Sequence, residues 1–401
     1  MPPVFRPGAT VSSFRLNAWR MFAIILVGLN LRPVLASVPP LLDLVQAATH
    51  MSDGTAGLLT ALPVFVMGLG ALGVAPLRRL MSEQQGVAIG LALIMAATAA
   101  RLWSGQTSLM LATGVVAGLG IAMTQALLPI FIKTRFGGGS SGVMGIYSTA
   151  IMGGAAVASV ATPALAQHAG WLRALAVWAW PAALALACWI AVARLSSAPR
   201  YAAQPAKAGA LRTARSRVWL LSVFFGLGTG AYTLVLAWLP PYYTALGWTP
   251  LAAGQLLGGV TAAEIVAGLL VSGFIGRLPD RRPALLTAIG ALFLGLVGWI
   301  AAPAALAWPA AVLAGLGIGA LFPLSLIVAM DHAGTPAEAG RLASFVQGVG
   351  YLIAALFPFA AGLMRQRLAD LTPAWILMTL ICVVLSVMAI RFRPLRQRSA
   401  T

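Results

Sequence analysis

The sequence predicts an all-α membrane protein in which twelve transmembrane helices form two bundles of six helices each. Three observations lead to this prediction. The 401 residues are 60% hydrophobic and only 8% charged, whereas about a quarter of the residues of a typical soluble protein are charged. Twelve apolar runs are each long enough to cross the hydrocarbon core of a bilayer. A basic segment separates the first six runs from the last six, and short sequences recur in both halves.

The expected elements follow one another closely along the chain. Residues 1–17 are a polar, basic tail, and residues 194–217 are a linker with five Arg and one Lys. We expect the first bundle at 18–193, with spans at about 18–45, 54–76, 87–103, 106–132, 139–163 and 171–193. We expect the second bundle at 218–390, with spans at about 218–244, 251–276, 284–303, 305–330, 339–364 and 372–390. Residues 391–401 form the second tail.

The formal net charge of +18 reflects membrane topology rather than a nucleic-acid partner, because the basic residues cluster in short segments between the spans. With the N-terminus inside, nearly all Lys and Arg residues fall on cytoplasmic segments. The opposite side holds only Arg101, Arg173, Arg365 and Arg367. This asymmetry follows the positive-inside rule. It predicts a protein surrounded by lipid, with both termini in the cytoplasm.

The two halves of the chain contain matching sequences. The matches are AGLGI at Ala117–Ile121 and Ala314–Ile318, and Pro39-Pro40 near the end of the first span with Pro240-Pro241 near the end of the seventh. Because these matches agree with the division into six and six spans, they predict two parallel-related halves with a binding site between them. The position equivalent to Arg32 falls near Thr233, so the second half lacks this arginine.

The first span contains two polar residues close to its middle, Asn30 and Arg32, within the segment 28–40. A charged side chain at this depth costs about 2.5–3.5 kcal/mol on insertion scales. Pro33 has no N–H group, so the carbonyl of Leu29 loses its helical partner and Arg32 is displaced from ideal α geometry. Arg32 could pair structurally with a neighbouring helix, or it could bind an anion in a cavity. We favour the anion-binding interpretation.

Glu264, near the centre of the eighth span, is the second charge at mid-membrane depth. It could pair with Arg32 across the two halves, as a gate or as a proton site, or it could be a protonated and hydrogen-bonded structural acid. If the two residues pair in the empty protein, an arriving anion could displace the carboxylate, which would then take up a proton. This sequence of events would be anion–proton symport.

Further polar side chains near the middle of spans are candidates for contact with a substrate. They are Asn30, Gln125, Tyr147, Tyr232, Ser344 and Gln347. Taken singly, each is better explained by an interhelical hydrogen bond, which contributes about 0.6–2 kcal/mol. Ser344, Gln347 and Tyr351 have the spacing i, i+3 and i+7, so they share one face of a helix.

The segment GRLPDRR resembles the loop signature of the major facilitator superfamily. The residues that carry this resemblance are Gly276, Asp280, Arg281 and Arg282. The matching loop after the second span, residues 73–85, keeps two arginines but lacks the aspartate. The alternative for both loops is ordinary positive-inside charge.

Five further segments resemble the cyanate permease family, which also includes exporters of nitroimidazole-type drugs. They are LVGLNLRPVLASVPPLL, AGLLTALPVFVMGLGAL, MSEQQGVAIGLAL, GLGIGALFPLSL and DHAGTPAEAGRLASFVQGVGYLIAALFP. The NLRP motif at Asn30–Pro33 is the most characteristic of these features. The resemblance implies transport of a small anion or small polar compound across the bacterial inner membrane. It also implies that the polar candidates lie on spans that line the central cavity.

We therefore expect a monomeric secondary transporter that moves a small, cyanate-like anion by alternating access, with or without proton coupling. The alternative is a proton-coupled exporter of small drugs, in which Glu264 matters more than Arg32. An intramembrane enzyme is disfavoured because no catalytic pair or His cluster occurs at membrane depth, and a receptor would normally add a signalling domain. No cofactor is expected. No metal site is expected either, because His50 and His168 have no companions at ligand spacing.

Overall fold

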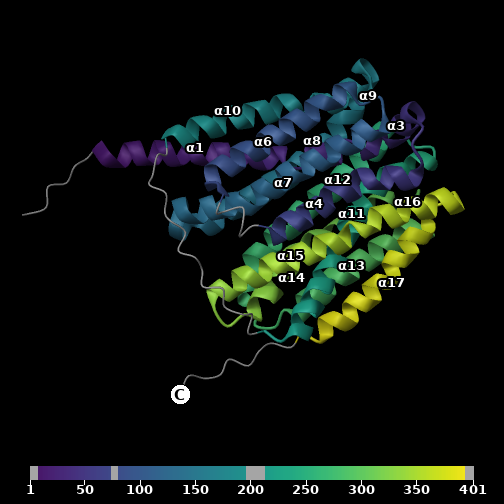
Figure 1. Cartoon of the computed structure of the whole chain (residues 1–401). Coiled ribbons are helices and arrows are strands. Elements are labelled where there is room, and N and C mark those ends of the chain that lie inside the picture. Colours follow the sequence, from purple (N-terminus) through teal and green to yellow (C-terminus); the bar gives the residue numbers. More distant parts are fainter. Residues whose placement is uncertain (1–7, 74–79, 196–212, 393–401) are drawn as a thin grey trace, which may run out of the picture.

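The computed structural model describes residues 8–73, 80–195 and 213–392, and these residues form helices and no strands (Figure 1). The helices of the first half are α1 (Gly8–Asn30), α2 (Pro33–Ala36), η1 (Pro39–Leu41), α3 (Leu42–Thr49), α4 (Asp53–Leu72), α6 (Glu83–Ala100), η2 (Arg101–Trp103), α7 (Thr107–Phe136), η3 (Gly137–Gly139), α8 (Ser140–Ala169), α9 (Trp171–Ala176) and α10 (Ala179–Leu195). Those of the second half are α11 (Arg215–Ala245), α12 (Pro250–Phe274), η4 (Ile275–Arg277), α13 (Arg282–Ala301), α14 (Ala307–Asp331), α15 (Pro336–Ala354), α16 (Leu356–Leu368) and α17 (Thr372–Ile390).

Twelve segments of the described residues are long and apolar enough to cross a membrane, so the predicted all-α membrane fold is confirmed. The first span runs over α1, α2, η1 and α3, and the eleventh runs over α15 and α16. Because the number of crossings is even, the described ends of the chain, Gly8 and Phe392, lie at the same end of the molecule. We call the opposite end, where α3 leads into α4 and α11 into α12, the distal end.

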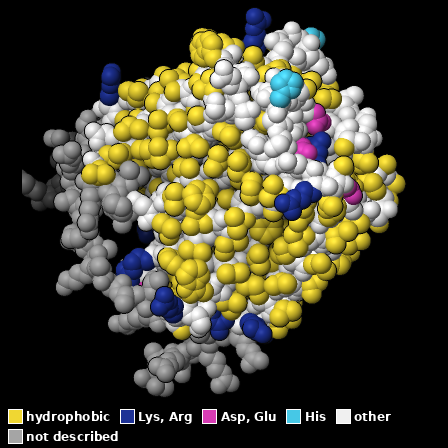
Figure 2. Space-filling model, turned by 45° about the vertical axis from the view of Figure 1, so that its right-hand side comes forward, with side chains coloured by type: hydrophobic (Ala, Val, Ile, Leu, Met, Phe, Trp, Pro, Cys, Tyr) yellow, Lys and Arg dark blue, Asp and Glu magenta, His cyan; other side chains and the backbone are white. Residues whose placement is uncertain are grey.

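The surface of the molecule is suited to lipid rather than to water. Hydrophobic side chains cover most of the face seen in Figure 2. On α17, for example, Leu380, Val383 and Val387 are each at least half exposed. Apolar side chains gathered on one surface would be unfavourable in water but match the hydrocarbon core of a bilayer.

The two halves meet along two pairs of membrane spans. In one pair α8 lies against α12, and in the other α4 lies against the span formed by α15 and α16. Small residues allow this close approach: a Cβ atom at Gly57 would overlap the carbonyl oxygen of Pro358, and one at Gly254 would overlap the carbonyl oxygen of Ser159. Without these glycines the halves could not pack at this distance.

The first span is broken at its middle, as Pro33 predicts. Helix α1 ends at Asn30, and α2 begins at Pro33, with Arg32 between them at φ −110° and ψ −19°. The carbonyl of Arg32 then accepts hydrogen bonds from the N–H groups of Leu35 and Ala36, at 3.0 and 2.9 Å. The break therefore places Arg32 at a junction between two helical segments, as in membrane proteins whose interrupted helices hold a substrate.

The same break generates a prediction about α8. The carbonyl of Leu29 projects against Gly154, where a Cβ atom would overlap its oxygen, whereas a Cβ atom at Gly153 would lie 3.6 Å from the Leu29 side chain. We expect Gly154→Ala to lower the free energy of unfolding by about 1–3 kcal/mol through overpacking. Gly153→Ala, the matched control, should not. Thermal unfolding of both purified variants measures this, and equal melting temperatures would contradict it.

Candidate functional site

Arg32 is the centre of a buried polar cluster. Its side chain is 4% exposed, and its guanidinium carbon lies 5.2 Å from the centre of the Tyr232 ring. The guanidinium donates a hydrogen bond to the hydroxyl of Tyr351, and Tyr147 and Glu264 lie within electrostatic range. A cation over an aromatic face gains energy from the ring quadrupole, most of all where water is excluded.

Both halves of the protein build this cluster. The first half contributes Arg32 from the junction after α1 and Tyr147 from α8; the second contributes Tyr232 from α11, Glu264 from α12 and Tyr351 from α15. All five side chains except Tyr232 are at least 94% buried. The cluster therefore lies at the interface between the halves, where the sequence repeat predicts a site.

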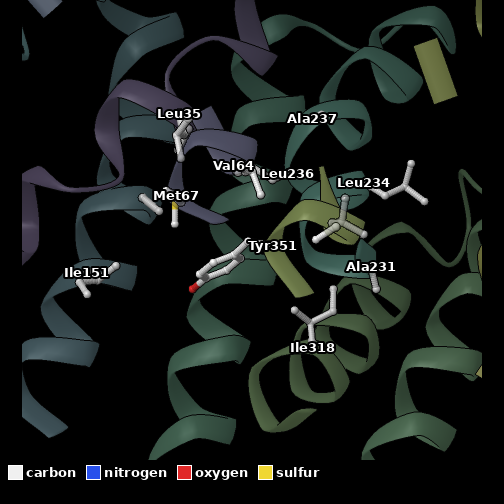
Figure 3. Packing of buried hydrophobic residues seen from close by; sticks show 14 of the residues in the cluster. Leu35, Val64, Met67, Ile151, Ala231, Leu234, Leu236, Ala237, Ile318 and Tyr351 are labelled. Carbon is white, nitrogen blue, oxygen red and sulfur yellow. The ribbon is translucent and has the colours of Figure 1, made fainter. Parts of the chain in front are cut away.

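Apolar side chains surround the cluster. Figure 3 shows Tyr351 among Leu35, Val64, Met67 and Ile318, which belong to one contiguous group of buried residues. In such surroundings a charge or a hydrogen bond interacts more strongly than it does in water. An unpaired polar atom is correspondingly costly here.

Several polar atoms at this site lack a partner. They are Nε of Arg32, the hydroxyl oxygens of Tyr147 and Tyr232, Oε2 of Glu264, and Oγ1 of Thr229, one turn before Tyr232 on α11. Buried polar groups are nearly always hydrogen-bonded, so a cluster of exceptions requires an explanation. Arg32 and the three hydroxyls can all donate, so the donors without a partner in this cluster suit a ligand that accepts hydrogen bonds.

The predicted option of an Arg32–Glu264 ion pair is not realised in this conformation. Among the described residues, the ion pairs within 4.0 Å join Arg281 to Asp331, Arg282 to Asp280, and Arg365 to Asp43 and Asp53. Arg32 and Glu264 interact only at longer range. Arg32 therefore has no carboxylate in direct contact, which leaves its charge available to an anion.

The remaining mid-span candidates take different positions. Asn30 is buried and donates from Nδ2 to the carbonyl of Leu26 at 2.8 Å, so it caps the end of α1. Gln125 of α7 and Ser344 and Gln347 of α15 are half-buried. None of these three side chains has a hydrogen bond among those that the described residues form, so their role in substrate binding stays a prediction.

The loop signature connects two helices of the second half. Arg282 binds Asp280 at 2.7 Å, and the hydrogen bonds that it donates hold the pKa of the Asp280 carboxyl below its usual range. Arg281 binds Asp331 at the end of α14 at 3.1 Å, while Gly276 lies in η4. Part of the matching loop after the second span, residues 74–79, lies outside the described residues.

Sequence reasoning assigns no role to three residues that the structure brings forward, Tyr351, Thr229 and Arg365. The sequence places Tyr351 on a polar helical face, but its bond to Arg32 depends on how α15 meets the first half. Thr229 and Thr233 lie on the same helix, and residue type alone does not separate the unpartnered hydroxyl of Thr229 from the hydrogen-bonded one of Thr233. Arg365 reads as an ordinary loop charge, yet it contacts both Asp43 and Asp53. The Thr229–Tyr232 spacing on one helical face is the one signal that could have been found.

Comparisons with known proteins place this chain among transporters. The family model of the Major Facilitator Superfamily matches residues 20–358, so the chain belongs to this superfamily. The D-xylose–proton symporter has the same fold, with a TM-score of 0.77 and 13% sequence identity over 94% of this chain and 98% of that chain.

Two relatives define the family more narrowly. Cyanate transport protein CynX of Escherichia coli is 38% identical over 377 residues, which cover 94% of this chain and 97% of that protein. The 2-nitroimidazole transporter of Escherichia coli is 30% identical over 350 residues, which cover 84% of this chain and 85% of that protein. The chain therefore belongs to the cyanate permease and nitroimidazole exporter family, as its sequence motifs predict.

The contrast between two threonines of α11 generates a prediction. Thr229 Oγ1 has no partner, whereas Thr233 Oγ1 donates to the carbonyl of Ala354 at 2.8 Å. Thr233→Val should lower the free energy of unfolding by about 1 kcal/mol or more, because it leaves that carbonyl without its donor. Thr229→Val should not destabilise the empty protein. Thermal unfolding without substrate compares them, and equal destabilisation would show that Thr229 is already satisfied.

Proposed function

We propose that this chain is a secondary active transporter that moves a small, cyanate-like anion across the inner membrane by alternating access. One observation carries the proposal. Arg32 is 4% exposed, lies at a helix break in the middle of the first span, and has no carboxylate within ion-pair distance. A charge at this depth is costly, and a bound anion would balance it.

The surroundings of Arg32 favour a small ligand. Tyr147 and Tyr351 are 3% and 6% exposed, so the site is enclosed on both sides of the interface between the halves. An anion at Arg32 could accept from Nε and from the free hydroxyls of Tyr147 and Tyr232. Charge-assisted hydrogen bonds of this kind are the strongest that a protein forms. The name of the cyanate transport relative, at 38% identity, agrees with a ligand of this size and charge.

The two-half construction supports alternating access. Because each half contributes residues to the site, rotation of one half against the other would open it to one side and close it to the other. We propose 18–193 and 218–390 as the moving units, 194–217 as the linker between them, and a monomer as the working form. By the positive-inside rule, the end that carries the termini faces the cytoplasm and the distal end faces outward.

Glu264 supplies a proposed route for proton coupling. Its Oε2 is buried and without a hydrogen-bond partner, and its carboxyl group interacts electrostatically with the guanidinium of Arg32. When an anion binds to Arg32, the favourable field of that guanidinium at Glu264 is neutralised, and the carboxylate takes up a proton from water on the open side. The anion and the proton then cross together, and both leave on the opposite side.

A second candidate is export of a small aromatic drug. A hollow of about 570 Å³ lies between α1, α8 and α12 and is lined by Leu29, Gly145, Gly153 and Leu269 among others. Its apolar wall lies beside the Arg32 junction and would admit an uncharged molecule from the bilayer. The 2-nitroimidazole transporter relative agrees with this alternative.

The charge of Arg32 can be tested directly. Arg32→Gln should lower uptake of radiolabelled cyanate into proteoliposomes by about tenfold or more, because it removes a charge-assisted contact. Cyanate should also raise the melting temperature of the wild type but not of this variant. Arg173→Gln, which changes an exposed arginine, is the control. Unchanged uptake by Arg32→Gln, with transport of 2-nitroimidazole retained, would favour the second candidate.

The role of Glu264 can be tested separately. A proton gradient directed into the proteoliposomes, with the outside more acidic, should stimulate cyanate uptake by the wild type. Glu264→Gln keeps the shape of the side chain but cannot carry the proton, so we expect it to lose the stimulation while it retains thermal stabilisation by cyanate. A stimulation equal to that of the wild type would rule out Glu264 as the proton carrier.

A further inference from the structure

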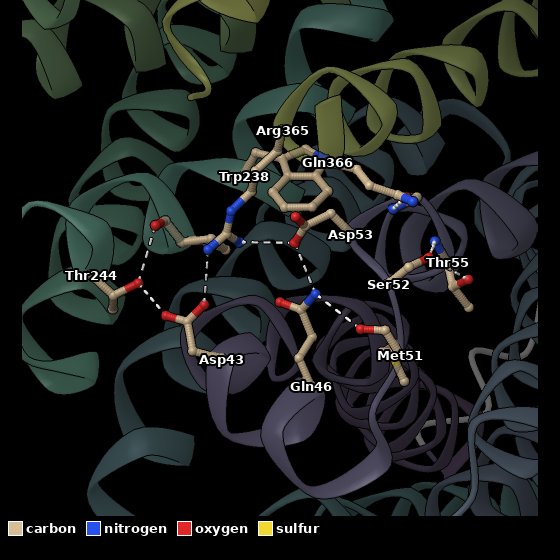
Figure 4. A network of polar contacts seen from close by, with 12 residues as sticks. Asp43, Gln46, Met51, Ser52, Asp53, Thr55, Trp238, Thr244, Arg365 and Gln366 are labelled. Carbon is tan, nitrogen blue, oxygen red and sulfur yellow. Dashed lines mark hydrogen bonds and ion pairs between the residues drawn. The ribbon is translucent and has the colours of Figure 1, made fainter. Parts of the chain in front are cut away.

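A network of charged and polar side chains joins the two halves at the distal end (Figure 4). At its centre, Arg365 of α16 reaches two carboxylates of the first half. Its Nη2 lies 3.3 Å from Oδ1 of Asp43 in α3, and its Nη1 lies 3.6 Å from Oδ1 of Asp53 in α4. The Arg365 side chain is 19% exposed, so water screens these pairs only in part.

Further contacts hold the two carboxylates in place. Gln46 donates from Nε2 to Asp53 at 2.9 Å, and Thr244 of α11 donates from Oγ1 to Asp43 at 2.5 Å. Next to Arg365, Gln366 accepts a hydrogen bond from the N–H of Gly54 at 3.1 Å. Together these contacts close the distal end between α3 and α4 on one side and α11 and α16 on the other.

The partners of Arg365 are divided unevenly between the halves. Both carboxylates belong to the first half, whereas the aromatic ring under the guanidinium, that of Trp238, belongs to α11 of the second half and lies 5.6 Å away. Trp238 is fully buried and donates from Nε1 to the carbonyl of Pro358 at 2.8 Å, so it stays with α16. Separation of the halves would move both carboxylates away from Arg365, while its guanidinium would remain over the ring of Trp238.

The second half gives Arg365 no carboxylate in direct contact among the described residues. The acidic residue that follows it most closely in sequence, Asp370, forms no ion pair with it and instead accepts two hydrogen bonds from Thr372 at Oδ1, both at 2.9 Å, and so caps the start of α17. Nη1 of Arg365 already makes no hydrogen bond in the closed arrangement. Opening of the distal end therefore exposes a cation that has lost its counter-ions at the mouth of the pathway to Arg32.

We propose that Arg365 is a second anion-binding position, which takes the transported anion when the distal end is open. Asp43 and Asp53 compete with the anion for the same guanidinium: the carboxylates hold Arg365 when the distal end is closed, and the anion binds it when they withdraw. In the closed state two carboxylates face one guanidinium, so the mouth repels anions. Opening reverses the sign of this local charge. The inference rests on the proposed function, because it requires an anionic substrate and two moving halves.

Three variants distinguish anion binding by Arg365 from a latch, in which Arg365 only holds the two halves together. We expect Arg365→Gln to raise the concentration of radiolabelled cyanate that half-saturates uptake from the distal side by about tenfold, and to weaken the dependence of uptake on ionic strength. Arg367→Gln, two residues along α16 and exposed, is the matched control and should leave both unchanged. The double variant Asp43→Asn/Asp53→Asn removes the competing carboxylates, so its half-saturating concentration should equal or fall below that of the wild type.

The outcomes separate clearly. If Arg365→Gln and the double variant shift the half-saturating concentration in the same direction and by the same factor, Arg365 is a latch only and the proposal is overturned. Arg365→Lys keeps the charge and should remain close to the wild type; a loss as large as that of Arg365→Gln, with an unchanged melting temperature, would also overturn it. Arg32→Gln is measured in parallel. If it abolishes uptake while Arg365→Gln has no effect, only this inference fails, and if neither has an effect, the proposed function fails.

Discussion

The structure depends on one buried cation, the guanidinium of Arg32, which lies at a break in the first span with no carboxylate in direct contact. Pro33 lacks an N–H group and ends α1. The carbonyl of Leu29, which thereby loses its helical hydrogen bond, fits against α8 because Gly154 has no side chain. Tyr232 and Tyr351 then meet the charge from the second half. Each of these features accommodates a cation at a depth where cations are costly. Around it, the hydroxyl groups of Tyr147 and Tyr232 are buried and have no hydrogen-bond partner.

The two halves share an architecture but differ at this position. Thr233, which the sequence repeat aligns with Arg32, donates to the carbonyls of Gly230 and Ala354. Helix α11 continues past it from Arg215 to Ala245 without a break. The hydroxyl of Thr233 is therefore hydrogen-bonded within the second half, whereas Nε of Arg32 in the first half has no partner. This asymmetry places one arginine, rather than a symmetric pair, at the middle of the interface between the two halves.

Hydropathy and a few motifs were sufficient to predict the fold, because the lengths of apolar runs are set by the thickness of the bilayer. The break at Pro33 was predictable for a similar reason, since the loss of an N–H group is a local covalent fact. Contacts between the halves were not predictable in this way. The two carboxylates that pair with Arg365, those of Asp43 and Asp53, lie more than 300 residues away in the sequence, and the Arg32–Glu264 pair that charge alone suggested is not formed. Such pairings depend on how the helices dock.

The separation of Arg32 from Glu264 has a consequence for energetics. The proposed cycle takes Glu264 as ionised in the empty carrier, which then holds one positive and one negative side chain in the membrane. The loaded carrier holds the guanidinium, a neutral acid and a monovalent anion, so both states have no net charge at the site. The membrane potential acts with about 2.3 kcal/mol per elementary charge for each 100 mV, and here it acts on neither state. Such a carrier would be electroneutral: concentration gradients alone would set the direction of flux, and a cell could depolarise without losing accumulated substrate.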